Sequence, residues 1–84
     1  MTTATYKTMP ALLESLTPFK HGSAHATKEV TRTRMEYRVY SYSTLIGTVV
    51  WDGSEGEYEK FLNERKYSMT TSRLQNIIRK AWGI

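Results

Sequence analysis

The run Met35-Glu-Tyr-Arg-Val-Tyr-Ser-Tyr-Ser-Thr-Leu-Ile-Gly-Thr-Val-Val-Trp51 decides the fold of this 84-residue chain. In its first half, the apolar residues Met35, Tyr37 and Val39 alternate with charged or aromatic ones, which is the period of a strand with one buried face. The second half is rich in β-branched residues and is followed by Asp52-Gly53. Ser43 and Thr44 separate the halves, so the run predicts an antiparallel β-hairpin.

The segment that follows the hairpin favours a short helix. Ser54 and Glu57 have the spacing of a capping box, and Tyr58, Phe61 and Leu62 recur at helical intervals. Gly56 weakens this prediction because glycine lowers helix propensity. Residues 67–69 are then too few for more than one edge strand.

The last residues of the chain predict an amphipathic helix that packs on one face of the sheet. Ser72 and Gln75 form a capping box at its start, and Gly83 lies where a left-handed residue would end it. Its apolar stripe has the i, i+3, i+4, i+7, i+8 spacing. The stripe consists of Leu74, Ile77, Ile78, Ala81 and Trp82.

The segment before the hairpin is less regular. Residues 1–8 are rich in threonine and predict a flexible leader, so that a single domain spans residues 9–84. Thr8 and Pro10 suit the start of a short helix, which Thr17-Pro18 ends. Residues 24–34 could be an edge strand or a loop. The predicted class is therefore α+β, with a short N-terminal helix, a hairpin or a small three- to four-stranded sheet, and the C-terminal helix.

Composition limits the kinds of function. The net charge is +4, yet residues 52–64 carry five acids and one base, whereas residues 65–84 carry five bases and no acid. Such polarity suits an anionic partner or head-to-tail pairing of two copies. The chain has no cysteine, no apolar run long enough to span a membrane and no signal peptide, so we expect a cytoplasmic protein without a membrane partner.

An enzyme is not expected, because the sequence offers no paired carboxylates, nucleophile with a base, or phosphate-binding glycine loop. His21 and His25 could hold a metal only on a helix, which Gly22 would break. His21 is interpreted as a turn residue whose ring ties a loop to a backbone carbonyl. We therefore predict no catalytic residues, no metal and no cofactor.

Three segments resemble a family of small uncharacterised domains from viruses of actinobacteria and related mobile elements. They are Pro18-Phe-Lys-His-Gly22, Tyr40-Ser-Tyr-Ser-Thr-Leu-Ile46 and Tyr67-Ser-Met-Thr-Thr-Ser-Arg-Leu-Gln75. Family members often have His where this chain has Leu74, which argues against essential chemistry at that position. The resemblance implies a viral or mobile-element origin, a host-cell location and a compact α+β fold, and it implies no activity.

Two groups of residues suggest nucleic-acid binding without catalysis. Tyrosines interleaved with arginines on a strand are typical of surfaces on which bases stack and phosphates are held. Bases and an asparagine on a helix can contact phosphates and base edges. The predicted site residues are Arg34, Arg38, Tyr40, Tyr42, Lys66, Arg73, Asn76, Arg79 and Lys80.

A protein-interaction module is the alternative, because tyrosine and arginine are also enriched at protein interfaces. In this interpretation the aromatic face or the acidic 52–64 segment binds a host protein, or the chain forms a homo-oligomer. Whether the acidic segment folds over the basic helix is left open by the sequence.

Overall fold

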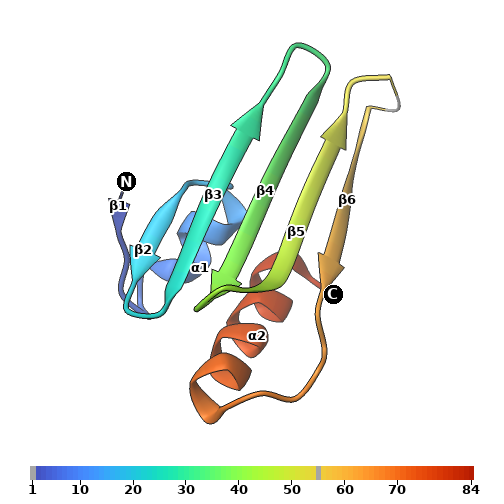
Figure 1. The fold of residues 1–84 in the computed structure, drawn as a ribbon. Coiled ribbons are helices and arrows are strands. Elements are labelled where there is room, and N and C mark those ends of the chain that lie inside the picture. Colours follow the sequence, from blue (N-terminus) through green and yellow to red (C-terminus); the bar gives the residue numbers. More distant parts are fainter. Residues whose placement is uncertain (1, 55) are drawn as a thin grey trace.

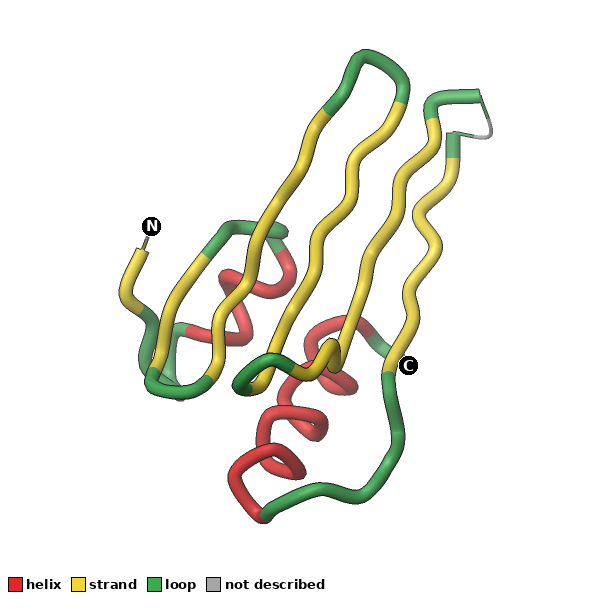
Figure 2. The backbone as a smooth tube through the Cα atoms, in the orientation of Figure 1, coloured by secondary structure: helices red, strands yellow, loops and turns green. Residues whose placement is uncertain are grey.

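A computed structural model describes residues 2–54 and 56–84, which form one sheet of six strands and two helices (Figures 1 and 2). In chain order the elements are β1 (Thr2–Thr3), α1 (Met9–Glu14), β2 (Phe19–His21), β3 (Ala24–Val30), β4 (Arg34–Ser41), β5 (Thr44–Asp52), β6 (Glu57–Leu62) and α2 (Met69–Trp82).

The α+β class is confirmed, but the expected sheet of three to four strands is wrong. The described strands number six and lie in the order β1-β2-β3-β4-β5-β6. β1 pairs with β2 in parallel, and each later neighbour is antiparallel. The additional strands come from the predicted leader, from residues 19–21 and from residues 57–62. Residues 24–30, an edge strand or a loop by sequence, form an interior strand.

The predicted hairpin is confirmed as β4 and β5, and its alternation separates the two faces of the sheet. Met35, Tyr37 and Val39 are buried on the face that carries both helices, which we call the inner face. Their neighbours Arg34, Glu36, Arg38 and Tyr40 point to the opposite, outer face. The Tyr37 hydroxyl donates to the Thr17 carbonyl (2.8 Å), which ties the core to the segment between α1 and β2.

Gly47 allows α2 to approach the sheet closely. A Cβ at this position would lie 2.9 Å from Cη2 and Cζ3 of Trp82. The indole of Trp82 therefore packs directly on the backbone of β5, and its Nε1 donates to the Leu13 carbonyl (3.0 Å). One aromatic ring thus joins the sheet, α1 and α2.

Residues 57–62 form strand β6, so the helix predicted there is wrong. Glu57 pairs with Asp52 and Leu62 with Gly47, which makes β6 an edge strand antiparallel to β5. An edge strand that is exposed on both faces needs no apolar alternation, and backbone pairing outweighed the helical spacing of Tyr58, Phe61 and Leu62.

The C-terminal helix is confirmed, but its start is four residues earlier than predicted. Ser68 is the N-cap and its side chain accepts from the Thr71 N–H, so residues 67–69 form no strand. Gly83 ends the helix in the left-handed conformation, as predicted. The buried side is also rotated from the predicted stripe, because Ile77 and Ala81 are only half-buried. The residues buried on α2 are Thr71, Leu74, Gln75, Ile78 and Trp82.

The described part of the leader joins the fold. Beyond β1, Ala4 is buried and its N–H donates to the Lys20 carbonyl (2.8 Å). α1 contains Pro10 in its first turn, as predicted, while the Thr8 side chain forms no cap hydrogen bond to the helix. Thr8 instead exchanges hydrogen bonds with Thr5.

Candidate nucleic-acid interface

The exposed side of α2 carries most of the helical residues predicted to bind nucleic acid. Arg73, Asn76 and Lys80 are exposed on successive turns because their spacing of three and four residues matches the helical repeat. Arg79 is half-buried beside them. Its guanidinium donates to Glu64 (Nη2 to Oε1, 3.2 Å) and to the Asn76 side chain (3.0 Å), so part of its charge is already neutralised.

Arg73 is oriented by an aromatic ring. Its Cζ lies 4.1 Å from the centroid of the Tyr6 ring, a cation–π contact that holds the guanidinium without neutralising it. Tyr6 comes from the segment before α1 and was missed in the sequence, where nothing signals its proximity to α2. The contact fixes the direction of one cation on the exposed side of the helix.

The loop between β6 and α2 adds two cations, Arg65 and Lys66, both exposed. Gln75 holds this loop against the helix, because its side-chain amide donates to the carbonyls of Asn63 (2.6 Å) and Arg65 (2.9 Å). Gln75 therefore orders the loop instead of capping the helix as predicted. Arg65 was not among the predicted residues, although its place next to Lys66 in the sequence was a usable signal.

The predicted sheet residues have a different environment. Arg38 forms ion pairs with Glu36 and with Glu29 (3.6 Å), and Arg34 pairs with Glu36 (3.5 Å). Both guanidinium groups thus have carboxylate partners on the outer face. Glu36 lies two residues from each arginine on β4, so strand alternation places it on their face, whereas Glu29 comes from β3 and its place depends on the cross-strand register.

The predicted tyrosines do not form one continuous surface. Tyr40 is half-buried on the outer face and stacks on its cross-strand partner His25, with centroids 4.9 Å apart and planes at 13°. Tyr42 lies in the β4–β5 turn with a φ of 56°, and its N–H donates to the Ser23 carbonyl (2.7 Å). Tyr40 could stack with a base only beside or in place of His25.

The two predicted groups lie on opposite sides of the molecule. Arg34, Arg38 and Tyr40 are on the outer face of the sheet, whereas α2 covers the inner face. A single stretch of nucleic acid therefore meets either the helix or the sheet residues, unless it bends around an edge of the sheet.

The acidic segment does not cover α2 as a whole. Within the described part of residues 52–64, Glu64 is the one acid that forms an ion pair with the helix. Asp52 accepts hydrogen bonds from the Ser54 N–H (2.9 Å) and hydroxyl (2.8 Å), which hold its pKa below the usual value. Glu57 and Glu59 lie on β6, across from Asp52 and Val50 on the outer face.

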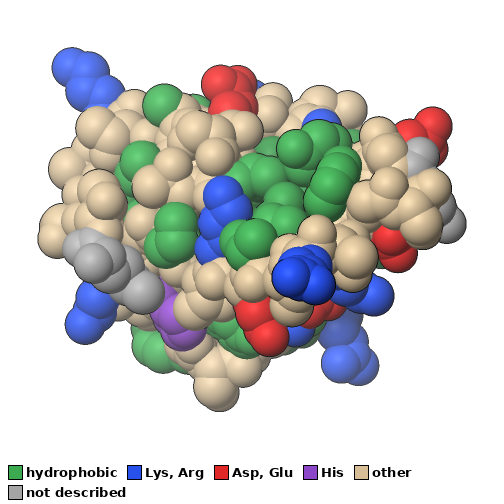
Figure 3. Space-filling model, turned by 90° about the horizontal axis from the view of Figure 1, so that it is seen from above, with side chains coloured by type: hydrophobic (Ala, Val, Ile, Leu, Met, Phe, Trp, Pro, Cys, Tyr) green, Lys and Arg blue, Asp and Glu red, His purple; other side chains and the backbone are tan. Residues whose placement is uncertain are grey.

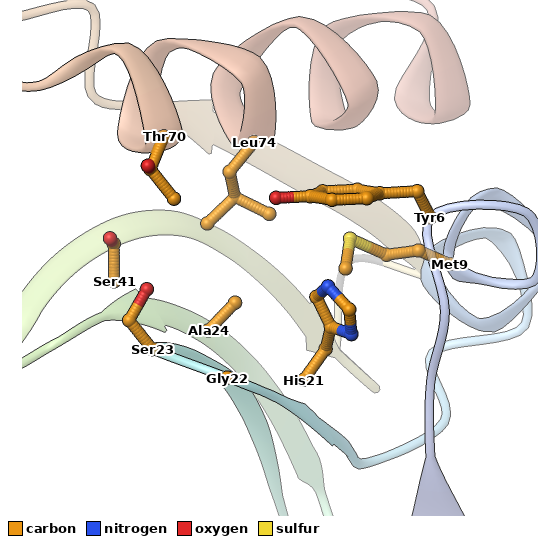
Figure 4. A pocket seen from close by; sticks show the side chains of 9 residues that line it. All are labelled: Tyr6, Met9, His21, Gly22, Ser23, Ala24, Ser41, Thr70 and Leu74. Carbon is orange, nitrogen blue, oxygen red and sulfur yellow. The ribbon is translucent and has the colours of Figure 1, made fainter.

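His21 and His25 do not share a site. His21 Nδ1 lies 2.8 Å from the Ala4 carbonyl, which confirms the predicted contact of the ring with a backbone carbonyl, but His21 is the last residue of β2 and not a turn residue. Figure 4 shows the ring beside the Met9 side chain, with Tyr6 beyond it, and all three line a small cavity of about 100 Å³, whereas His25 faces the other side of the sheet. The described residues contain no cluster of three side chains suited to a metal ion.

No protein-family model, curated protein or solved structure matches the chain. In the part of the chain that the structure describes, neither helix is long and apolar enough to cross a membrane.

Proposed function

We propose that the protein is a small accessory protein, of viral or mobile-element origin as the resemblance implies, that binds nucleic acid through α2 without catalysing a reaction. The binding surface, called the α2 basic face, consists of Arg65, Lys66, Arg73, Asn76 and Lys80. One observation carries the proposal. The four cations of this face form no ion pair among residues 2–54 and 56–84, whereas Arg34, Arg38 and Arg79 are all paired.

The arrangement suits phosphate contacts better than sequence-specific readout. Arg73 and Lys80 are separated by seven residues, or about 10 Å along the helix axis. Asn76 between them is also of a type that contacts base edges, but its side-chain carbonyl oxygen already accepts a hydrogen bond from Arg79. Binding should therefore be electrostatic, with a Kd of roughly 1 to 100 µM in moderate salt.

A titration of labelled single- and double-stranded DNA at two salt concentrations tests the proposal. With about four phosphate contacts, log K should fall with log salt with a slope of roughly −3 to −4 for duplex DNA. Arg73→Gln and Lys80→Gln should each reduce this slope by about one unit. Arg38→Gln on the outer face is the matched control and should leave it unchanged.

Absence of binding at tens of micromolar protein in low salt would overturn the proposal. A loss of affinity in Arg38→Gln that exceeds the loss in Arg73→Gln would instead move the interface to the sheet. The alternative function, a protein-interaction module, is favoured by a different surface at the far end of the sheet, where the apolar side chains of Val30 and Tyr58 lie uncovered.

A further inference from the structure

The sheet extends beyond its two helices. β4 and β5 contain 8 and 9 residues, which corresponds to about 27–30 Å of strand. Figures 1 and 2 show both helices against one end of the sheet, so that the β3–β4 and β5–β6 hairpins extend past them. The inner face of this far end has no helix from the described residues on it.

Apolar side chains cross the far end in a single row. Val30 pairs with Met35, Met35 with Trp51, and Trp51 with Tyr58, so the row spans four strands on the inner face. Its end members are open to solvent, with exposed fractions of 67% for Val30 and 59% for Tyr58. Large apolar side chains gathered in this way mark interaction surfaces in soluble proteins.

The next row on the same face ends in a lysine on each side. Lys28 pairs with Tyr37 on one side, and Lys60 pairs with Val49 on the other. Tyr37 and Val49 are buried, while both lysines are exposed. We call the six residues Val30, Met35, Trp51, Tyr58, Lys28 and Lys60 the distal apolar face. Seen from the hairpin tips in Figure 3, apolar side chains gather in one patch with basic side chains at its border.

A groove continues this face between the ends of the two helices. It has a volume of about 350 Å³, and Tyr58 and Lys60 line it together with Leu16, Val49 and the end of α2 at Ala81 and Trp82. Lys60 Nζ donates to the Trp82 carbonyl (3.2 Å), which holds the lysine at the border. Glu14 also lines the groove at its α1 end, as a single acid opposite the one lysine of the lining, Lys60.

The dimensions of the distal apolar face match one α-helix. β3 and β6 are three strand spacings apart, or about 14 Å, so Val30 and Tyr58 at the two ends of the uncovered row are separated by slightly more than the diameter of a helix, about 10–12 Å. Such a helix would lie on the sheet beside α1 and α2 and complete the helical layer. Met35 itself is buried, so the exposed apolar contacts for such a helix come from Val30 and Tyr58.

Charge selects the kind of helix. A lysine on each side attracts a helix whose apolar stripe is flanked by carboxylates and repels one flanked by bases. The chain's own α2 fails this criterion, because its exposed side carries Arg73 and Lys80. We propose that the distal apolar face docks an amphipathic helix of a partner protein in which acidic residues flank the apolar stripe. This inference does not depend on nucleic-acid binding.

Two synthetic helical peptides of about 16 residues, or about 24 Å of helix, test the proposal. They share one leucine stripe and differ in having glutamate or lysine beside it. In fluorescence anisotropy, the acidic peptide should bind at least about tenfold more tightly than the basic one. In protein labelled for NMR, the acidic peptide should shift the amide signals of residues 28–35 and 49–60.

Variants at exposed positions check the assignment without disturbing the core. The double variant Val30→Ser/Tyr58→Ser should bind the acidic peptide about fivefold or more weakly. Lys28→Glu with Lys60→Glu should reverse the preference, so that the basic peptide binds more tightly. Lys20→Glu, on the outer face, is the matched control and should change neither affinity. Equal affinity for the two peptides, or a dimer whose formation is abolished by Val30→Ser with Tyr58→Ser, would overturn the proposal.

Discussion

At the scale of single residues, Tyr37 connects stability to pH. The ring is fully buried and its hydroxyl donates to the Thr17 carbonyl, and burial raises its pKa above the ordinary value. The native state therefore favours the protonated phenol. This contribution is complete below the unfolded pKa of about 10 and is lost as pH rises from there toward the higher native pKa.

Tyr37→Phe should consequently lower the free energy of unfolding at pH 7 by about 1 kcal/mol, the usual net value of one buried hydrogen bond. At pH 10.5 the difference between wild type and variant should shrink by roughly 0.8 kcal/mol, because the unfolded wild type then ionises. Urea unfolding at both pH values measures this difference. Tyr40→Phe on the outer face is the control, and an equal pH response in both variants would contradict the assignment to Tyr37.

At the scale of elements, the start of α2 can be tested by two serines. Ser68 caps the helix, whereas Ser72 lies inside it and its N–H donates to the Ser68 carbonyl (2.9 Å). Ser68→Ala should cost about 1 kcal/mol, and Ser72→Ala should be neutral or slightly stabilising. Thermal unfolding should then show a Tm lower by roughly 4–8 °C for Ser68→Ala alone. A larger loss of stability in Ser72→Ala than in Ser68→Ala would mean that Ser72 is the N-cap, as the sequence predicted.

The same two serines show what sequence patterns can and cannot decide. Ser72 with Gln75 has the spacing of a capping box, but Gln75 uses its amide on the Asn63 and Arg65 carbonyls, which belong to a loop that sequence spacing does not position. β4 was predicted because one buried face imposes strict alternation on its residues. β6 was not, because an edge strand lacks that constraint and the spacing of Tyr58 and Phe61 fits a helix equally well.

At the scale of the whole molecule, the placement of surfaces depends on pairing between distant segments. Thr2 pairs with Phe19 and Glu29 with Glu36, and the register between β3 and β4 brings the Glu29 carboxylate beside Arg38. The sequence predicted which residue types were available for binding. It could not predict that the helical and sheet groups face opposite sides, or that the end members Val30 and Tyr58 of one cross-strand row remain uncovered.

The two proposed surfaces should therefore act independently. The α2 basic face lies on the exposed side of the helix, and the distal apolar face lies toward the hairpin end of the sheet, where Lys60 reaches the Trp82 carbonyl at the end of α2. Interactions between exposed charges are largely screened beyond about 8 Å at physiological salt, so DNA and the acidic peptide should bind together with affinities that change less than about twofold.

A cross-titration checks this independence. The double variant Lys28→Glu/Lys60→Glu should no longer bind the acidic peptide but should keep most of its affinity for DNA. The double variant Arg73→Gln/Lys80→Gln should lose affinity for DNA and still bind the acidic peptide. Because each variant changes the net charge, it should also slightly change the affinity for the other ligand. This small change should disappear as salt is raised, because salt screens long-range electrostatic interactions more strongly than direct contacts. Competition between DNA and the acidic peptide that persists in high salt would mean that both ligands use one surface.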